Sequence, residues 1–180
     1  MTGSRFLYRG RFLGIRECEN WEFASRTNAR AVAVLVPVTD EQELVLVEQF
    51  RIPVQSPVIE LPAGLVGDQD DADESVLTAA ARELEEETGF TAGRLTPLMT
   101  CPSSAGLSDE MITFVLAEDL ARTGPGGGDA SEDIQVHRVP LASASDWLSG
   151  QMGRGKQVDP KIYAVLYWLG RRAAGLPLPP

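Results

Sequence analysis

The sequence predicts an α+β fold with α/β-like layering, in which a mixed β-sheet lies between helices and a small antiparallel sheet precedes it. Strand-like segments come first, then one helix, then more strands and two helices, an order typical of such layered proteins. The apolar run at residues 31–36 is typical of a strand covered on both faces. We expect an N-terminal sheet segment (1–28), a main domain (29–175) and a frayed tail (176–180).

Turn residues separate the apolar runs and so set the order of the elements. Gly10 and Asn20 divide three short runs in the N-terminal segment. Pro160 is placed to open the last helix, because proline suits a first helical turn. We expect strands at residues 6–8, 12–15, 21–23, 31–36, 44–50, 58–60, 95–100, 111–117 and 134–139, and helices at 74–90, 143–148 and 160–174. The last of these helices has an apolar side made of Ile162, Val165, Leu166 and Leu169.

The helix at residues 74–90 has clear ends and two distinct faces. Asp73 or Ser75 can cap its first amides, and Gly89 stands where helices commonly end in a left-handed residue. Because successive helical residues are rotated by roughly 100°, regularly spaced side chains share a face. The spacing predicts a core stripe made of Leu77, Ala81, Leu84 and Thr88.

The same spacing brings Glu83, Glu86 and Glu87 together on another face, whereas Glu85 points elsewhere. Like charges at these positions disfavour a helix by roughly 0.2–0.5 kcal/mol per pair. A solvated acidic face is the simpler interpretation, because carboxylates usually lie exposed. However, a packed helix fixes these oxygens in space, and converging carboxylates suit Mg²⁺ or Mn²⁺, which would offset the repulsion.

Composition excludes several classes of function. The chain has 180 residues, enough for one domain, with 26 acidic and 16 basic side chains and a net charge of −10. This balance argues against nucleic-acid binding, which requires a basic face. The first twenty residues lack the apolar stretch of a signal peptide, and no run is long enough to span a membrane. Cys18 and Cys101 match no metal-binding spacing, so we expect a cytoplasmic protein with reduced thiols.

One motif carries a resemblance to a known family. Glu74, seven further residues, and then Arg-Glu-Leu-Glu-Glu-Glu-Thr-Gly-Phe at 82–90 resemble the signature of the Nudix hydrolases. In that signature five residues separate the first glycine from the first glutamate, whereas nine separate Gly64 from Glu74. We therefore expect a four-residue insertion within residues 66–73, where a longer loop costs little closure entropy.

Three further segments are similar to the Nudix subgroup that cleaves ADP-ribose and other nucleoside diphosphate sugars: residues 49–51, 60–64 and 104–110, although Ala105 stands where the subgroup often has proline. The resemblance implies a Nudix fold and hydrolysis of a pyrophosphate bond, giving a nucleoside monophosphate and a sugar phosphate. It also implies a homodimer, formed through the N-terminal sheet.

The resemblance also assigns roles to individual residues. It implies that the carbonyl of Ala63 and the carboxylates of Glu83, Glu86 and Glu87 bind the metal, with Glu86 also counted as catalytic. Glu110 is the candidate general base, with Asp109 and Glu118 as rivals. We expect Arg82 to pair with Glu74 and orient the acidic cluster.

Two substrate-binding candidates have simpler alternatives. Arg51 can hold a diphosphate in its planar fork or form a surface ion pair. The resemblance implies that Trp21, with Phe23, reaches a nucleotide base, and the alternative is an ordinary core or dimer aromatic.

Other segments favour structural roles. The Gly-rich stretch at residues 122–131 lacks the ending of a phosphate-binding loop and favours a linker, and His137, with no histidine or cysteine partner, favours a structural role. Two other functions stay open: a Nudix enzyme acting on dinucleoside polyphosphates or coenzyme A, and a Nudix-like sensor that binds a nucleotide sugar without cleaving it.

Overall fold

A computed structural model describes residues 3–68, 73–128 and 132–178 of the chain. The expected strands and helices are present there, together with two unexpected strands, β7 and β11; most strands are longer than predicted, whereas the first and last helices are slightly shorter. In chain order the elements are β1 (Arg5–Arg9), β2 (Leu13–Cys18), β3 (Trp21–Arg26), β4 (Ala31–Pro37), β5 (Glu43–Arg51), the 3₁₀ turn η1 (Ile52–Val54), β6 (Ser56–Glu60), β7 (Ala63–Val66), α1 (Val76–Thr88), β8 (Phe90–Pro102), β9 (Met111–Arg122), β10 (Gln135–Pro140), η2 (Leu141–Ser143), α2 (Ala144–Gly153), β11 (Gln157–Val158) and α3 (Lys161–Ala173).

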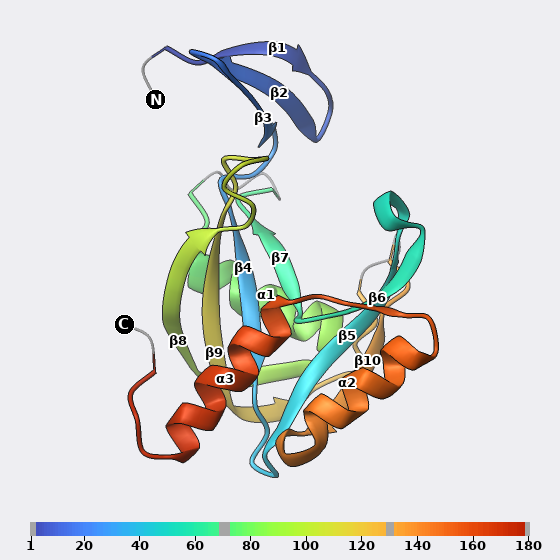
Figure 1. Ribbon diagram of the computed structural model, residues 1–180. Helices are drawn as coiled ribbons and strands as arrows, with labels where there is room; N and C mark the ends of the chain where they lie inside the picture. Colours follow the sequence, from blue (N-terminus) through green and yellow to red (C-terminus); the bar gives the residue numbers. More distant parts are fainter. Residues whose placement is uncertain (1–2, 69–72, 129–131, 179–180) are drawn as a thin grey trace.

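The small N-terminal sheet is antiparallel, in the order β1-β2-β3, and it stands apart from the layers of the main domain (Figure 1). Its last strand is joined to the loop between β8 and β9. The amide of Ala24 donates to the carbonyl of Leu107 over 2.8 Å, and the amide of Asp109 donates to the carbonyl of Ala24 over 3.2 Å. The sheet is therefore anchored mainly along one edge.

The main domain divides its strands over two mixed sheets of four strands, in the orders β7-β4-β9-β8 and β10-β5-β6-β11. In the first sheet β4 runs parallel to β9, and in the second β11 runs parallel to β6. Helix α1 covers one side of β4, while α3 lies on the opposite side (Figure 1). The predicted α+β fold class is thus confirmed, with two mixed sheets where the sequence suggested one.

The strand β4 is covered on both faces, as its continuous apolar run predicts. Ala33 and Leu35 belong to the core cluster beneath α1, and Val34 and Val36 belong to the cluster that α2 and α3 cover. Successive strand residues point to opposite faces, so one apolar strand supplies both halves of the core.

Helix α1 is capped as the sequence predicts. Ser75 is the N-cap, its side chain accepting from the amide of Thr78, and Gly89 ends the helix in the left-handed conformation with φ of 72°. The two ends of the helix are therefore set by local chemistry.

The predicted core stripe of α1 is wrong in part. Leu84 and Thr88 are buried, but Leu77 and Ala81 are exposed, and Ala79 and Ala80 are buried in their place. The buried face is rotated about one residue from the expected stripe, which turns Glu87 inward. Small side chains at the contact allow the helix axis to approach the sheet closely.

Helix α3 closes the other side of the molecule. Ile162, Val165 and Leu169 are buried on its apolar side, and Trp168 meets Phe114 edge to face at a centroid distance of 4.9 Å. Beyond the helix, Leu178 packs against this core. Residues 179–180 of the expected tail and residues 69–72 of the expected insertion lie outside the described residues. None of the helices in the described part of the chain is long and apolar enough to cross a membrane.

Candidate active site

The acidic edge of α1 faces the strand β7, and its three carboxylates differ in burial. Glu87 is 3% exposed, and one of its oxygens accepts from the amide of Ala63 over 3.0 Å. The side chain of Glu83 is also largely buried, whereas that of Glu86 is 42% exposed. Burying two carboxylates side by side is costly unless partners or an ion compensate for the charge.

Gly64 is what allows α1 to come so near to β7. A Cβ built on Gly64 would lie 1.8 Å from Cδ of Glu83 and 2.0 Å from its Cγ. A side chain at this position would occupy the space that the carboxylate fills. The strand therefore needs glycine here for steric reasons, since its φ is an ordinary one.

Arg82 holds the carboxylates together. Its Nε donates to Glu74 over 3.3 Å, and its Nη1 donates to Glu83 over 2.7 Å and to Glu86 over 3.2 Å. Its Nη2 donates to the carbonyl of Leu65 on β7 over 3.2 Å. The expected Arg82–Glu74 pair is present, and the same guanidinium also pairs with two of the proposed metal ligands.

Burial sets the protonation of this edge. It raises the pKa of Glu87 to about 8, an effect to which the nearby charges of Glu83 and Glu132 add. Burial also raises the pKa of Glu83, although Arg82 opposes it. For Glu74 burial is outweighed by the bond from the Gly67 amide and by Arg82, so the pKa of Glu74 is lowered.

A cavity of about 330 Å³ opens beside this edge. It brings together Ala63, Glu83 and Glu86 with Arg51, four of the residues that the sequence singles out. Arg51 also pairs with Glu60 over 2.6 Å. Its position is therefore compatible with holding a diphosphate and with forming an ion pair at the surface. Three charged side chains in the cavity were not expected from the sequence, and these are Arg26, Asp68 and Glu132.

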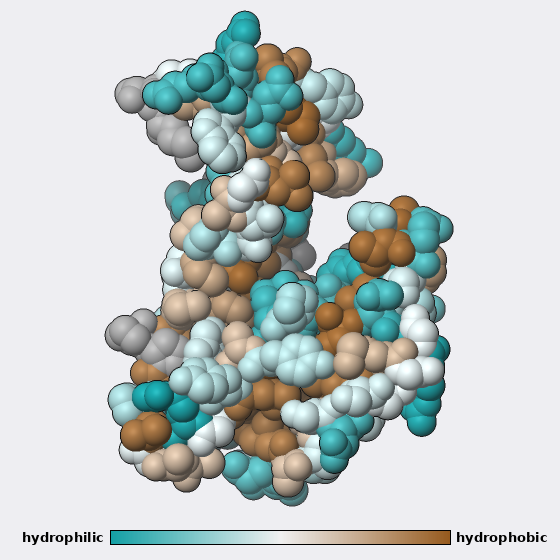
Figure 2. Space-filling view, in the orientation of Figure 1, coloured by the Kyte–Doolittle hydropathy of each residue, from teal (hydrophilic) through white to brown (hydrophobic). Residues whose placement is uncertain are grey.

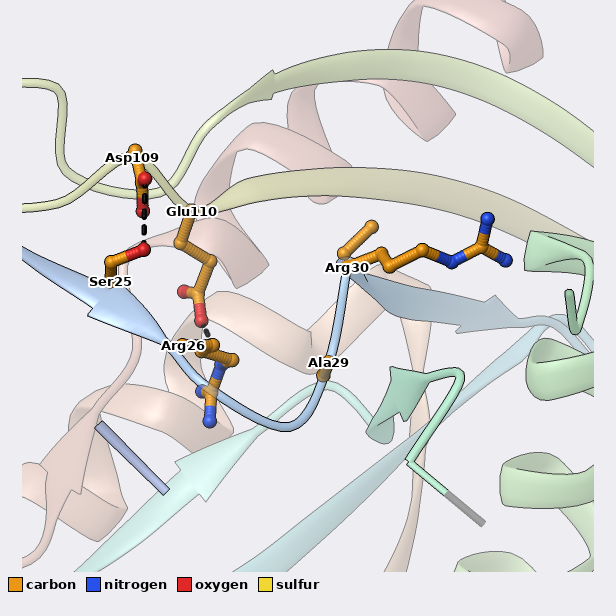
Figure 3. A pocket seen from close by; sticks show the side chains of 7 residues that line it. Ser25, Arg26, Ala29, Arg30, Asp109 and Glu110 are labelled. Carbon is orange, nitrogen blue, oxygen red and sulfur yellow. Dashed lines mark hydrogen bonds and ion pairs between the residues drawn. The ribbon is translucent and has the colours of Figure 1, made fainter. Parts of the chain in front are cut away.

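Glu110 lies in a neighbouring cavity of about 140 Å³. Figure 3 shows its carboxylate turned toward Arg26, with which it forms an ion pair, while Asp109 accepts a hydrogen bond from Ser25 over 3.0 Å. Arg26 lines both cavities and so lies between Glu110 and the acidic edge of α1. These bonds join the end of β3 to the loop before β9.

Trp21 lies away from the acidic edge within this chain. It is 62% exposed and lines a separate cavity with Cys18, Phe23 and the loop of Gly106 and Ser108. His137 is paired with Glu48 over 2.8 Å and packs against Trp147, which agrees with a structural role.

The donor set of the acidic edge fits a hard divalent cation, although the carboxylates are engaged elsewhere. Among the described side chains, no three His, Cys, Asp or Glu residues surround a common point. Glu83 and Glu86 instead accept hydrogen bonds from Arg82. Two buried carboxylates with raised pKa nevertheless suit Mg²⁺ or Mn²⁺, and Ala63, whose carbonyl the signature implies as a further ligand, lines the same cavity as Glu83. Such an ion would replace the guanidinium at Glu83 and Glu86.

The sequence gives little sign of Arg26 or Glu132, because both come together with α1 through tertiary packing. Arg26 ends a strand of the N-terminal sheet, and Glu132 follows the Gly-rich stretch. The acidic pair of Glu132 and Asp133 just before β10 was the available signal for Glu132.

The fold and the site together define a class of protein. It is an α+β domain in which one helix presents carboxylates, suited to a divalent cation, at a cavity that also holds arginines. The family model described as NUDIX domain matches residues 29–165. The chain belongs to this family, as the signature on α1 indicates.

Known relatives extend over most of the chain. It is 43% identical over 115 residues to the ADP-ribose pyrophosphatase of Bacillus subtilis (strain 168), which covers 63% of this chain and 60% of that protein. It is 33% identical over 134 residues to the GDP-mannose pyrophosphatase of Citrobacter koseri, covering 69% and 68%. The chain thus spans about 60% of the length of the first of these relatives.

The solved "Crystal structure of ADP compounds hydrolase" matches 97% of this chain and 93% of its own, with a TM-score of 0.72 and 24% identity. This match shows the fold.

We expect Glu87→Gln to raise the thermal midpoint of the metal-free protein. The pKa of Glu87 is raised from 4.5 to about 8, so the folded state holds this proton more tightly than the unfolded chain. The free energy of unfolding therefore falls as the pH rises from 4.5 toward about 8. A neutral glutamine removes this loss of stability. Thermal unfolding in the presence of EDTA should therefore show a difference in midpoint between the variant and the wild type that grows as the pH rises through this range.

The matched control is Glu85→Gln, because Glu85 is exposed on the same helix. Added Mn²⁺ should stabilise this control and the wild type but not Glu87→Gln. Equal stabilisation of all three proteins would exclude Glu87 from the metal site.

Proposed function

We propose that the protein hydrolyses the pyrophosphate bond of ADP-ribose or a related nucleoside diphosphate sugar, using Mg²⁺ or Mn²⁺. The products are a nucleoside monophosphate and a sugar phosphate. The observation that carries the proposal is that one cavity contains the largely buried carboxylate of Glu83, the neighbouring carboxylate of Glu86 and Arg51. The names of the relatives, which act on ADP-ribose and GDP-mannose, supply the substrate class.

Different residues of the site bind the metal ion and the diphosphate. Glu83, Glu87 and the carbonyl of Ala63 hold the ion, with Glu86 as an additional ligand. Arg51 leaves Glu60 and binds the diphosphate through its fork, since a guanidinium pairs with phosphate bidentately. A divalent ion bound at this edge supplies positive charge against the diphosphate and lowers the pKa of water.

Hydrolysis adds the elements of water across the pyrophosphate. The water oxygen bonds to one phosphorus, the bridging P–O bond breaks, and the other phosphate leaves with a proton. A general base must take the proton of the attacking water. Glu110, as the sequence motif implies, and Glu132 are the two candidates, and the position of Glu132 in the same cavity as Glu83 favours it.

We expect Glu132→Gln to lower kcat by ~10²–10⁴-fold, the usual contribution of a general base. Glu110→Gln should lower it by less than about tenfold, because Glu110 is paired with Arg26 in the neighbouring cavity. Initial rates at saturating substrate and Mg²⁺ measure both effects. The reverse order of the two losses would make Glu110 the base.

The assay for the whole proposal is release of nucleoside monophosphate from a panel of ADP-ribose, GDP-mannose, a dinucleoside polyphosphate and coenzyme A. Glu83→Gln should lose at least ~10³-fold in turnover with its fold intact, because it loses a metal ligand and a buried partner of Arg82. Glu85→Gln should keep the wild-type rate.

Other outcomes of the panel decide between the remaining functions. Cleavage of the polyphosphate or of coenzyme A alone would indicate the other type of Nudix enzyme. Tight binding of a nucleotide sugar without release of monophosphate would indicate a sensor.

We further propose that the protein is a cytoplasmic homodimer formed through the N-terminal sheet. Figure 2 shows apolar side chains on this sheet and on the tip around η1, on either side of an open recess. A three-stranded sheet with so little core of its own gains stability from a partner surface. Its exposed apolar side chains are Phe6, Leu7, Tyr8, Phe12, Leu13, Ile15 and Trp21.

In such a dimer Trp21 would contact the base of a nucleotide held by the partner, which fits its distance from the acidic edge of its own chain. Cys18 and Cys101 are free thiols, as a reducing cytoplasm maintains them.

Light scattering should give twice the chain mass of 19.5 kDa for the wild type. Leu13→Glu should shift the protein to the monomer, because it places a charge on the apolar sheet. Leu176→Glu, an equally exposed leucine near the C-terminus, is the control and should stay dimeric. A monomeric wild type would exclude the dimer.

A further inference from the structure

The Gly-rich stretch at residues 124–128, for which the sequence favours a linker, is docked on the end of α1. The amide of Gly127 donates to the carbonyl of Glu87 over 2.9 Å, and that of Gly128 donates to the carbonyl of Glu86 over 3.0 Å. The last carbonyls of a helix have no partners within it, so these bonds satisfy two of them. The peptide groups of two proposed metal ligands thus hold this stretch in place.

Close backbone packing makes the docking specific. A Cβ built on Gly126 would lie 2.5 Å from the carbonyl carbon of Thr88 and 2.7 Å from the carbonyl oxygen of Glu87. On its other side the stretch is tied to the returning chain, since the amide of Ile134 donates to the carbonyl of Gly127 over 3.3 Å. The stretch therefore bridges α1 and the chain that enters β10.

Gly128 differs from its neighbours in what surrounds it. Its φ is +80°, and a Cβ built on it would lie 2.4 Å from Oε2 of Glu132 and 2.7 Å from Cβ of Glu132. The side chain of Glu132 thus occupies the space that a residue larger than glycine would need. Glu132 in turn lines the cavity beside Glu83 and Glu86, and its charge adds to the raised pKa of Glu87.

We propose that Gly128 is a positioning residue that seats the carboxylate of Glu132 over the acidic edge of α1. Because Gly128 is bonded to the carbonyl of Glu86, the seat has a fixed place relative to the helix that carries the metal ligands. This inference rests on the proposed function, in which Glu132 is a candidate base. A displaced base slows proton transfer and leaves substrate binding nearly unchanged.

The chain offers a matched control for the strain of a left-handed residue. Gly127 has φ of +112°, yet a Cβ built on it would meet only the carbonyl oxygen of Ile134, at 3.7 Å. Gly127→Ala therefore imposes an unfavourable backbone conformation in the same stretch without pressing on Glu132. Comparing the two alanine variants therefore separates the effect of displacing Glu132 from the effect of backbone strain.

The experiment measures kcat, KM and Mn²⁺ affinity for both variants, with ADP-ribose as substrate, together with their thermal midpoints. Gly128→Ala should lower kcat at least ~30-fold and change KM and Mn²⁺ affinity by less than about threefold. Gly127→Ala should lose a similar amount of thermal stability but less than about fivefold in kcat. In a double mutant, Gly128→Ala should add little to the loss caused by Glu132→Gln, since both act on one carboxylate.

Equal losses of kcat in the two alanine variants, or additive losses in the double mutant, would overturn the inference. So would a Glu132→Gln variant with wild-type kcat. If the wild type is active and Gly128→Ala has the same kcat, this inference alone is overturned. If the wild type cleaves no compound of the panel, the proposed function is overturned.

Discussion

The architecture of the site depends on how closely α1 lies against β7. The helix approaches through Ala79 and Ala80, and the strand meets it with Gly64, so the carboxylate of Glu83 takes the place of a Cβ. At this separation the amide of Ala63 reaches Glu87. The contact therefore does two things at once, because it seals part of the core and presents backbone groups to buried carboxylates.

This approach has an electrostatic cost that the protein offsets through neighbouring groups. Arg82 donates hydrogen bonds to Glu74, Glu83 and Glu86, and Glu74 and Glu83 raise its pKa despite burial. Glu74 in turn accepts from the amide of Gly67 over 2.9 Å, which joins the end of β7 to the segment just before the helix. Glu87 accepts a hydrogen bond from the amide of Ala63, yet burial raises its pKa to about 8, although the charge of Arg51 opposes this rise. An ion at this edge would therefore relieve a cost that the fold already bears.

Local chemistry explains what the sequence could predict. Ser75 and Gly89 cap α1 through contacts within one helical turn, so the residues alone predicted them as caps. The apolar run of β4 was equally predictable, because side chains alternate between the two faces of a strand and a continuous apolar run must therefore be buried on both. The rotated core stripe of α1 was missed because Leu77 is a stronger apolar signal than Ala79 or Ala80. The small residues are buried because the helix must approach β7, a tertiary requirement that periodicity does not contain.

The groups that complete the cavity were harder to predict, because each depends on contacts between distant segments. β7 is a strand only through pairing with β4, and Arg26 reaches the cavity because β3 is bonded to the loop of Leu107. The sequence of the stretch around Gly126 is typical of a linker, and its role becomes visible only from its packing against the end of α1.

These distant contacts converge on one rigid helix. The side chains of α1 present the acidic edge, and its terminal carbonyls hold the stretch that leads to Glu132. A carboxylate placed in this way keeps its distance from the acidic edge of α1 although it belongs to a separate segment. The reason is that the carboxylate and the acidic edge are both held by the backbone of α1. Reactions that transfer a proton to a positioned group lose rate when this distance changes by as little as ~1 Å. A helix that anchors both partners is thus a direct way for the fold to hold that distance.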